Sequence, residues 1–459
     1  MSEPFFSKPA CRSCCTIVRS MEVMNRIAIT GVGLVTPLGL SVDENVTRSC
    51  RGESGIRAAT AFTVEGHSAK SLAVIPEFDL ESSLRFPKNY KFMGRSVQFA
   101  MRAAHEAVNS SGLDFATIDP TRAGIQVGSG QTGVEYDDFF PSLIMAWDGG
   151  RELDYKYLGG LPSHLIDRYI CLRTLANGGL ALLSTEFGIR GPNGNFAQKD
   201  TASALALNAA YLDLAEGRCD IALAGGYDSV ATPGNFLAYE QAGLLSHAGP
   251  GEAGAPFDIR SDGLVLGEGA GFLVLERWEH AESRGAVILG EFLGVTMATG
   301  HDPQWRPAWT ADTVCEAAGH ALEGLVPDFA VAAGLGTPPE DRCEAASISV
   351  AVGNGTPVTA LKSSTGYMGA ATAAAELGLG LLCARQGFVP AIARHRQAPP
   401  YVELDLISGT PRPVENPAPL GLFFSCSWGG AVAAVAARAI APASTAPAFT
   451  CFPPYRRID

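Results

Sequence analysis

Residues 191–226 read GPNGNFAQKDTASALALNAAYLDLAEGRCDIALAGG, a polar turn that runs into an apolar helix and then an apolar strand. We expect the helix from residue 201 to 216, because this run is rich in alanine and leucine and Gly217 can end it. The strand, residues 219–226, has the short continuous apolar run of a strand covered on both faces. This succession predicts an α/β fold with both elements buried.

The composition is that of a globular protein with a large core. The 459 residues are 47% hydrophobic and 18% charged, and the 52 glycines lie among many short apolar runs. The net charge of −13 argues against nucleic acid and anionic membranes as partners. No apolar run reaches the length of a membrane span, and the N-terminus lacks the apolar core of a signal peptide, so we expect a cytoplasmic protein.

Two α/β series follow one another along the chain. Each opens with a buried strand, RIAITGVGLVTPLG at 26–39 and VILGEFLGV at 287–295. The first strand contains Gly31 and Gly33, but the third glycine and the ribose-binding acid of a dinucleotide motif are missing, so we expect no such cofactor. The predicted divisions are a disordered leader at 1–24, one half at 25–285, a second half at 286–440, and a proline- and alanine-rich tail at 441–459.

Two other segments have an unusual composition. The leader contains Cys11, Cys14 and Cys15, but no further ligands follow at a suitable spacing, so no metal site is expected. Residues 137–176 mix aromatic and acidic side chains, which is typical of a partly buried excursion or an interface.

Several segments, in this order, resemble the β-ketoacyl synthase family of the thiolase fold. The resemblance covers roughly 26–440 and implies a five-layered αβαβα core built from two similar halves, normally as a dimer. It also implies condensation of acyl chains that are bound to an acyl carrier protein. The matching segments are RIAITGVGLVTPLG, EFGIRGPN, GRCDIALAGGYDS, PFDIRSDGLVLGEGAGFLVLE, KSSTG and SWGG.

The family works with a cysteine at the mouth of a buried helix and with two histidines. The cysteine takes the acyl chain as a thioester, and the histidines assist decarboxylation and stabilise the enolate oxygen. Spacing puts Asp200 at the cysteine position. Ala333, in AGLGTP, and Tyr367, in KSSTGYMGAA, occupy the two histidine positions. None of the eight histidines falls at either position, so no member of the catalytic set is intact.

Other positions of the family pattern keep their residue or hold a residue of the same kind. Thr337 and Lys362 match residues that the family keeps. The late Phe-Gly-Gly element reads Trp428-Gly429-Gly430. We take these three residues and Phe196 as candidates for lining the substrate tunnel, and we expect Trp428 and Tyr367 to reduce the former active-site cavity.

Asp200 at the mouth of a helix is interpreted first as an N-cap. A carboxylate there accepts from free backbone N–H groups and complements the helix dipole, which would also lower its pKa. Such a carboxylate is a poor nucleophile toward a thioester. A catalytic acid or base at Asp200 is the alternative.

Three unrelated replacements at catalytic positions resemble the chain-length factor, or ketosynthase β-subunit. That resemblance implies a non-condensing subunit, inactive alone, that pairs with an intact ketosynthase and shapes the acyl tunnel in type II polyketide or fatty-acid-like biosynthesis. It implies no cofactor in this chain, because the phosphopantetheine arm of the carrier protein would reach the partner's site. Such subunits commonly carry glutamine where this chain has Asp200.

Two further hypotheses stay open. One is an acyltransferase of altered reaction type, forming an ester or amide from acyl carrier protein with Asp200 as general base. The other is a structural homodimer with a closed tunnel.

Overall fold

A computed structural model describes residues 26–130, 136–147, 152–160, 167–301 and 308–442. The leader predicted at 1–24, with its three cysteines, lies outside these residues, as does almost all of the predicted tail.

The strands form two sets with the same topology. From one edge of the sheet to the middle, the first set is β5 (Asn193–Phe196), β4 (Ala123–Ser129), β6 (Ile221–Ser229), β7 (Glu268–Arg277) and β1 (Ile27–Val35). The second set continues with β8 (Gly290–Thr299), β15 (Ala431–Ala439), β14 (Leu420–Cys426), β9 (Phe329–Val331), β10 (Pro357–Thr359) and β12 (Asp405–Leu406).

The pairing directions show that the two halves are alike. Strand β7 runs antiparallel to both β1 and β6, as β15 does to both β8 and β14. Strand β4 runs parallel to both β6 and β5, as β9 does to both β14 and β10. The halves meet where residues 27–29 of β1 pair with residues 290–292 of β8. The prediction of two similar α/β halves is confirmed.

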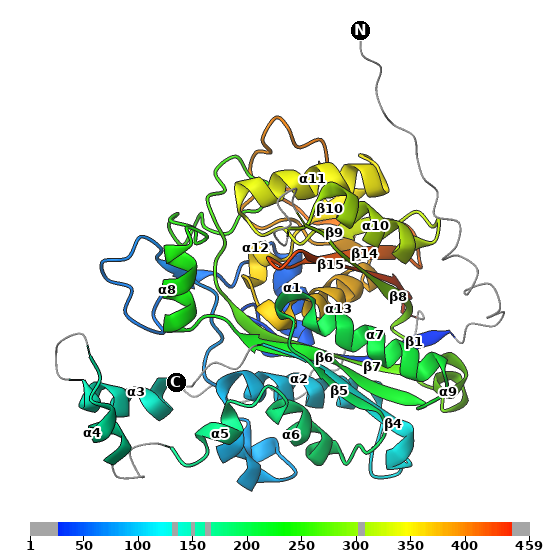
Figure 1. Ribbon diagram of the computed structural model, residues 1–459. Helices are drawn as coiled ribbons and strands as arrows, with labels where there is room; N and C mark the ends of the chain where they lie inside the picture. Colours follow the sequence, from blue (N-terminus) through cyan, green and yellow to red (C-terminus); the bar gives the residue numbers. More distant parts are fainter. Residues whose placement is uncertain (1–25, 131–135, 148–151, 161–166, 302–307, 443–459) are drawn as a thin grey trace.

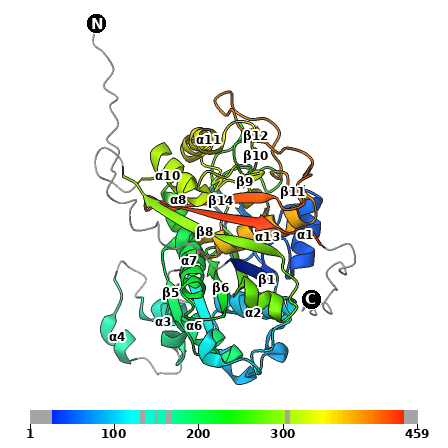
Figure 2. The same cartoon turned by 90° about the vertical axis from the view of Figure 1, so that its right-hand side faces the viewer.

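Helices cover and separate the two sets of strands. Helices α2 (Arg95–Ser111) and α6 (Gly178–Phe187) cover the outer face of the first, and α10 (Ala311–Leu322) and α11 (Pro338–Val352) that of the second. Helices α7 (Ala202–Ala215) and α13 (Thr372–Arg385) lie between them, so Figure 2 shows five layers from top to bottom. The three largest clusters of buried side chains follow these layers.

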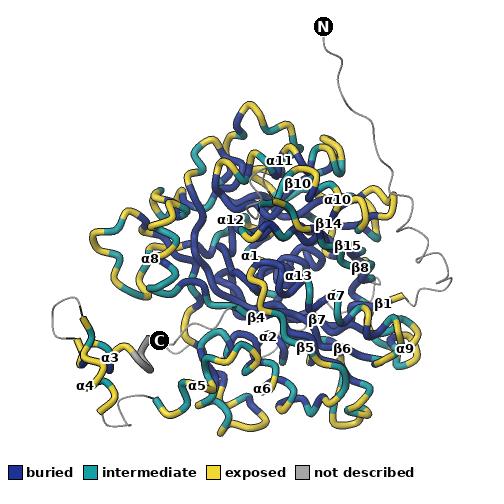
Figure 3. Tube along the Cα trace, in the orientation of Figure 1, coloured by how far each residue is buried: buried dark blue, intermediate teal, exposed yellow. Residues whose placement is uncertain are grey.

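The sequence explains why α7 and α13 take the middle layer. Both are apolar on all sides, and every residue of α13 is buried (Figure 3). Helix α7 ends at Ala215 and is followed by Gly217 in the left-handed conformation, close to the end predicted from the sequence.

Gly31 and Gly33 have a packing role. A Cβ atom on Gly31 would lie 2.1 Å from the carbonyl oxygen of Ala107, and one on Gly33 would lie 1.8 Å from that of Ala103. Strand β1 therefore needs both glycines so that α2 can cross it closely.

The remaining elements are short or peripheral. The α-helices among them are α1 (Val42–Cys50), α3 (Tyr136–Ala146), α4 (Tyr155–Gly160), α5 (Ile170–Arg173), α8 (Pro233–Gln241), α9 (Trp278–Ser283) and α12 (Lys362–Thr365). The 3₁₀ helices are η1 (Glu81–Ser83), η2 (Pro87–Phe92), η3 (Pro120–Arg122), η5 (Lys199–Thr201) and η6 (Gly369–Ala371). Two small ladders pair β2 (Arg57–Ala58) with β3 (Ser71–Leu72), and β11 (Phe388–Val389) with β13 (Arg412–Pro413).

The segment 137–176, predicted to be a partly buried excursion or an interface, contains helices that stand apart. Helices α3 and α4 pack against each other and lie away from the layered body in Figure 1. They carry exposed apolar side chains, among them Ile144, Met145, Tyr155 and Tyr157. None of the helices in the described residues is both long and apolar enough to cross a membrane.

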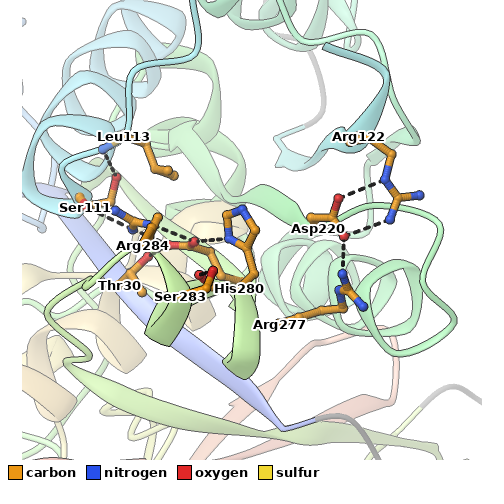
Figure 4. Close-up of polar contacts among 10 residues, drawn as sticks. Thr30, Ser111, Leu113, Arg122, Asp220, Arg277, His280, Ser283 and Arg284 are labelled. Carbon is orange, nitrogen blue, oxygen red and sulfur yellow. Dashed lines mark hydrogen bonds and ion pairs between the residues drawn. The ribbon is translucent and has the colours of Figure 1, made fainter. Parts of the chain in front are cut away.

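A buried polar cluster fastens the outer layer to β7 (Figure 4). The side chain of Glu276 is fully buried and accepts hydrogen bonds from Thr30 and from Arg284. One of its oxygens also lies 2.7 Å from Nδ1 of His280. Arg284 donates to the backbone oxygen of Ser111 at 2.9 Å as well, which ties the end of α2 to the residue that follows α9. Both carboxylate oxygens of Glu276 are therefore paired.

Candidate active site

Asp200 lies at the start of the central helix, but it does not cap it. It belongs to η5, and α7 begins at Ala202 with Thr201 as its N-cap residue. The side chain of Asp200 is buried, and neither carboxylate oxygen has a hydrogen-bond partner of ordinary geometry among the described residues. The predicted cap is wrong, because the extra turn of η5 moves Asp200 off the position that can reach the first free N–H groups of α7.

The predicted pKa of Asp200 is also wrong in direction. Burial is the largest effect and raises the pKa of the carboxyl. The hydroxyl of Tyr367 and the ammonium group of Lys362 act in the opposite direction without outweighing burial. The backbone of Asp200 is firmly held, because Oγ of Ser425 on β14 donates to its carbonyl oxygen at 2.7 Å. The site therefore holds a fixed, buried carboxyl.

Tyr367 faces Asp200 from the opposite half of the molecule. Its backbone N–H donates to the oxygen of Val265, and its own oxygen accepts from the N–H of Gly267, both at 2.8 Å. Its hydroxyl oxygen accepts a long hydrogen bond from Tyr239 on α8, with 3.5 Å between the oxygens. Burial raises the pKa of Tyr367 well above its usual range, and the nearby Asp200 adds to this, so the phenol stays protonated.

Ala333 leaves the first histidine position without a functional side chain. Its backbone N–H donates to Glu344 at 2.6 Å, and that of Gly334 donates to the same carboxylate at 2.8 Å. Thr337 precedes α11, but its hydroxyl has no hydrogen-bond partner among the described residues. Asp341 supports this loop by accepting from the N–H of Gly336 at 3.0 Å, and burial raises its pKa to about 7.

Lys362 is paired with an acid that the sequence reading missed. Its Nζ lies 3.1 and 3.3 Å from the two carboxylate oxygens of Glu376, and both side chains are buried. Burial raises the pKa of Glu376 to about 7, against the effect of Lys362. Glu376 is the lone acid in the otherwise apolar run TAAAELGLGLL, and that isolation was the available signal. Tyr239 and Glu344 gave no comparable signal.

The tunnel candidates are divided between two places. Trp428 is half-buried and packs on a cluster that includes Leu335 and Tyr367, and its indole N–H lacks a partner among the described residues. Beside it, Gly429 is exposed, and Gly430 is buried with a φ of +81°. Phe196 lies apart, half-buried on the edge strand β5. Tyr367 acts on Asp200 and belongs to the cluster on which Trp428 packs, whereas Phe196 does not join that cluster.

No nearby thiol replaces the missing nucleophile in the described part of the chain. Cys426, at the end of β14, is fully buried, and burial raises the pKa of its thiol well above the usual range. Asp200 raises the pKa of that thiol further. Burial likewise raises the pKa of Cys219 to about 12. Neutral buried thiols are poor nucleophiles, so neither can take an acyl chain.

Two family models match along the chain. The N-terminal domain of β-ketoacyl synthases matches residues 24–281, and the C-terminal domain matches residues 317–395. The chain belongs to the β-ketoacyl synthase family. Asp200, Ala333 and Tyr367 stand at the three positions that the resemblance to this family predicts for its cysteine and two histidines.

Relatives and solved structures agree that the chain belongs to the β-ketoacyl synthase family. A polyketide β-ketoacyl synthase of Streptomyces cyaneus is 31% identical over 403 residues, which cover 84% of this chain and 92% of that protein. A 3-oxoacyl-[acyl-carrier-protein] synthase 2 of Coxiella burnetii is 28% identical over 84% of this chain and 92% of its own length. The ishigamide ketosynthase/chain length factor structure matches with a TM-score of 0.80 and 26% identity, covering 92% of this chain and all of the matched chain.

Proposed function

We propose that this chain is a non-condensing subunit of the chain-length-factor type, which pairs with an intact β-ketoacyl synthase and shapes its acyl tunnel. The observation that carries the proposal is the buried carboxyl of Asp200 at the nucleophile position, with Tyr367 against it. A carboxyl there supplies no thiolate to load, so this chain alone forms no acyl thioester.

The other two replacements support the same conclusion. Condensation needs imidazole donors that stabilise the enolate formed on decarboxylation. Ala333 has no donor in its side chain, and its backbone N–H is already bound to Glu344. Lys362 is likewise held by Glu376. We therefore assign the condensation itself to a partner, whose active site would receive the phosphopantetheine arm of the carrier protein.

Two surface features suit a heterodimer. Strand β5 pairs with β4 on one side and, within the described residues, has no strand on the other. Helices α3 and α4 expose apolar side chains that a partner would cover at a gain in free energy. The names of the relatives support a role in polyketide or fatty-acid-like biosynthesis, and the ishigamide structure supports the chain-length-factor type.

Coexpression with an intact ketosynthase from the same genome tests the proposal. We expect a stable heterodimer by size-exclusion chromatography, and no acyl adduct on this chain by mass spectrometry after incubation with malonyl- or acyl-carrier protein. Ile144→Asp on α3 should weaken the heterodimer, whereas Leu237→Asp, at an exposed leucine of α8, is the matched control. A covalent acyl adduct on this chain, or a chain indifferent to every ketosynthase tried, would contradict the proposal.

A second candidate is the acyltransferase of altered reaction type. It is favoured by one observation, the buried Asp200 that has no hydrogen bond of ordinary geometry within the described residues and has a raised pKa, which suits a general base. Ester or amide formed from acyl carrier protein and a nucleophile, and lost in Asp200→Asn, would support it. The third hypothesis, a structural homodimer, would be supported if the chain forms a homodimer, binds no ketosynthase and yields no product.

A further inference from the structure

Asp200, Tyr367 and Tyr239 form a chain of three acid–base groups that loading and condensation do not use. Asp200 comes from η5 at the mouth of α7, Tyr367 from the turn after α12, and Tyr239 from α8. Asp200 and Tyr367 are buried, while Tyr239 is half-buried and lies 3.5 Å from Tyr367 between hydroxyl oxygens. The carboxyl of Asp200 is thus buried beside the phenol of Tyr367, whose oxygen accepts a hydrogen bond from Tyr239.

Asp200 differs from the buried acids near it because its oxygens have no hydrogen bond of ordinary geometry within the described residues, although the Tyr367 hydroxyl acts on its carboxyl. The neighbouring Asp228 accepts from the N–H groups of Ser229 and Ala370. Glu344 and Glu376 are also paired. A buried carboxyl whose oxygens lack well-formed hydrogen bonds lowers the stability of the fold. Its presence here points to a chemical use or to a bound donor.

We propose that Asp200 and Tyr367 form a proton-transfer site that enolises a β-ketoacyl chain. The Asp200 carboxylate would remove a proton from the carbon between the two carbonyl groups. The C–H electron pair would move onto a carbonyl oxygen, which the Tyr367 hydroxyl stabilises by donating a hydrogen bond. Asp200 would then return the proton to carbon, so the step is balanced without an oxidant, reductant or co-reactant.

The chemistry of the two side chains fits this reaction better than it fits condensation. A carboxyl base opposed by a tyrosine hydroxyl is the arrangement that ketosteroid isomerase uses beside a carbonyl. The raised pKa of Asp200 makes it a stronger base than an exposed aspartate, and the protonated phenol of Tyr367 remains a donor. Tyr239 strengthens Tyr367 as a donor, because the Tyr239 hydroxyl donates a hydrogen bond to the Tyr367 oxygen. Enolisation needs no thiolate, so this activity goes beyond the proposed tunnel-shaping role.

Two half-buried aromatic residues pack on the cluster that contains Tyr367. Tyr239 and Trp428 pack on the same cluster as Tyr367, and Gly429 beside Trp428 is exposed. A substrate would therefore reach Tyr367 from the side of Trp428. The indole N–H of Trp428 has no partner among the described residues and can bind a second carbonyl.

The test measures deuterium uptake at the α-carbon of S-acetoacetyl-N-acetylcysteamine by mass spectrometry. The reaction is run in the cold at mildly acidic pD, where exchange catalysed by the buffer is slow. The full chain should accelerate exchange over buffer, either unmodified or after Trp428→Ala opens the site. Asp200→Asn should lower the enzymatic rate about 100-fold or more, as for loss of a general base. Tyr367→Phe should lower it by about 100-fold, as for loss of an oxyanion donor.

Two controls separate catalysis from a structural effect. Tyr239→Phe should lower the rate only a few-fold, while Tyr227→Phe, at a buried tyrosine that donates to the backbone oxygen of Ala176, should leave it unchanged. The rate should rise with pD along a single limb as Asp200 ionises. The charged or titratable groups that interact electrostatically with Asp200 are Tyr367, Tyr239, Lys362, Lys199, Asp228, Glu376 and Cys426.

The outcomes are decisive. Exchange that depends on both Asp200 and Tyr367 in folded variants supports the site. No acceleration by either the unmodified chain or the Trp428→Ala variant overturns it, as does exchange that survives Asp200→Asn. Partner binding is measured separately by chromatography, so failure here leaves the heterodimer proposal standing.

Discussion

Glu276 and Asp200 are both carboxylates buried in the same half of the molecule, yet their surroundings are opposite. Glu276 is surrounded by Thr30, His280 and Arg284, which Figure 4 labels. Each oxygen of Glu276 is paired. Asp200 has no partner of ordinary geometry for either oxygen. The first carboxylate fastens elements together, whereas the second is maintained at a cost in stability, which is typical of functional sites.

The largest expected effect is at the satisfied carboxylate. Glu276→Ala leaves the buried hydroxyl of Thr30 and the half-buried guanidinium of Arg284 without their carboxylate partner, so we expect the free energy of unfolding to fall by about 3 kcal/mol or more. Urea denaturation measures this. Glu279→Ala, at an exposed glutamate of the same α9 region, is the control and should change stability little. Equal stability of the two variants would show that the cluster has no fastening role.

A smaller effect of opposite direction is expected at the unsatisfied carboxylate. Asp200→Asn removes an acid that is expensive to ionise in place, so the free energy of unfolding at neutral pH should stay equal or rise by up to about 1 kcal/mol. The neighbouring Asp228→Asn is the matched control. This substitution replaces a carboxyl that accepts hydrogen bonds from two backbone N–H groups, and should lower the free energy of unfolding by about 1 kcal/mol. A loss at Asp200 as large as at Asp228 would restore the capping interpretation.

The smallest effect is a change in pH dependence. Because the pKa of Asp200 is raised in the folded state, the unfolded chain releases this proton first as pH rises above about 4. The folded state then binds more protons, so this group lowers stability as pH increases. We expect the stability of Asp200→Asn relative to the natural chain to increase with pH, by a fraction of about 1.4 kcal/mol per pH unit. Urea titrations across this range would test it, and a difference that shrinks with pH would reverse the assigned shift.

The sequence determined the fold because its apolar patterns and glycines are local and strong. The largely apolar run after Asp200 predicted a buried helix, and α7 follows it to Ala215. The repeated strand openings at 26–39 and 287–295 correctly indicated two similar halves. The assignment of Asp200, Ala333 and Tyr367 to the three catalytic positions rests on the sequence alone and stays a prediction.

Only the tertiary structure decided the state of Asp200. A sequence places a carboxyl near a helix mouth, but whether it caps the helix depends on a few ångströms of backbone, here the turn η5. Its pKa depends on groups far away in the chain, since α13, β14 and the residues around Tyr367 exclude water from it. Desolvation is a sum over everything packed around a group, and local sequence carries no record of that sum.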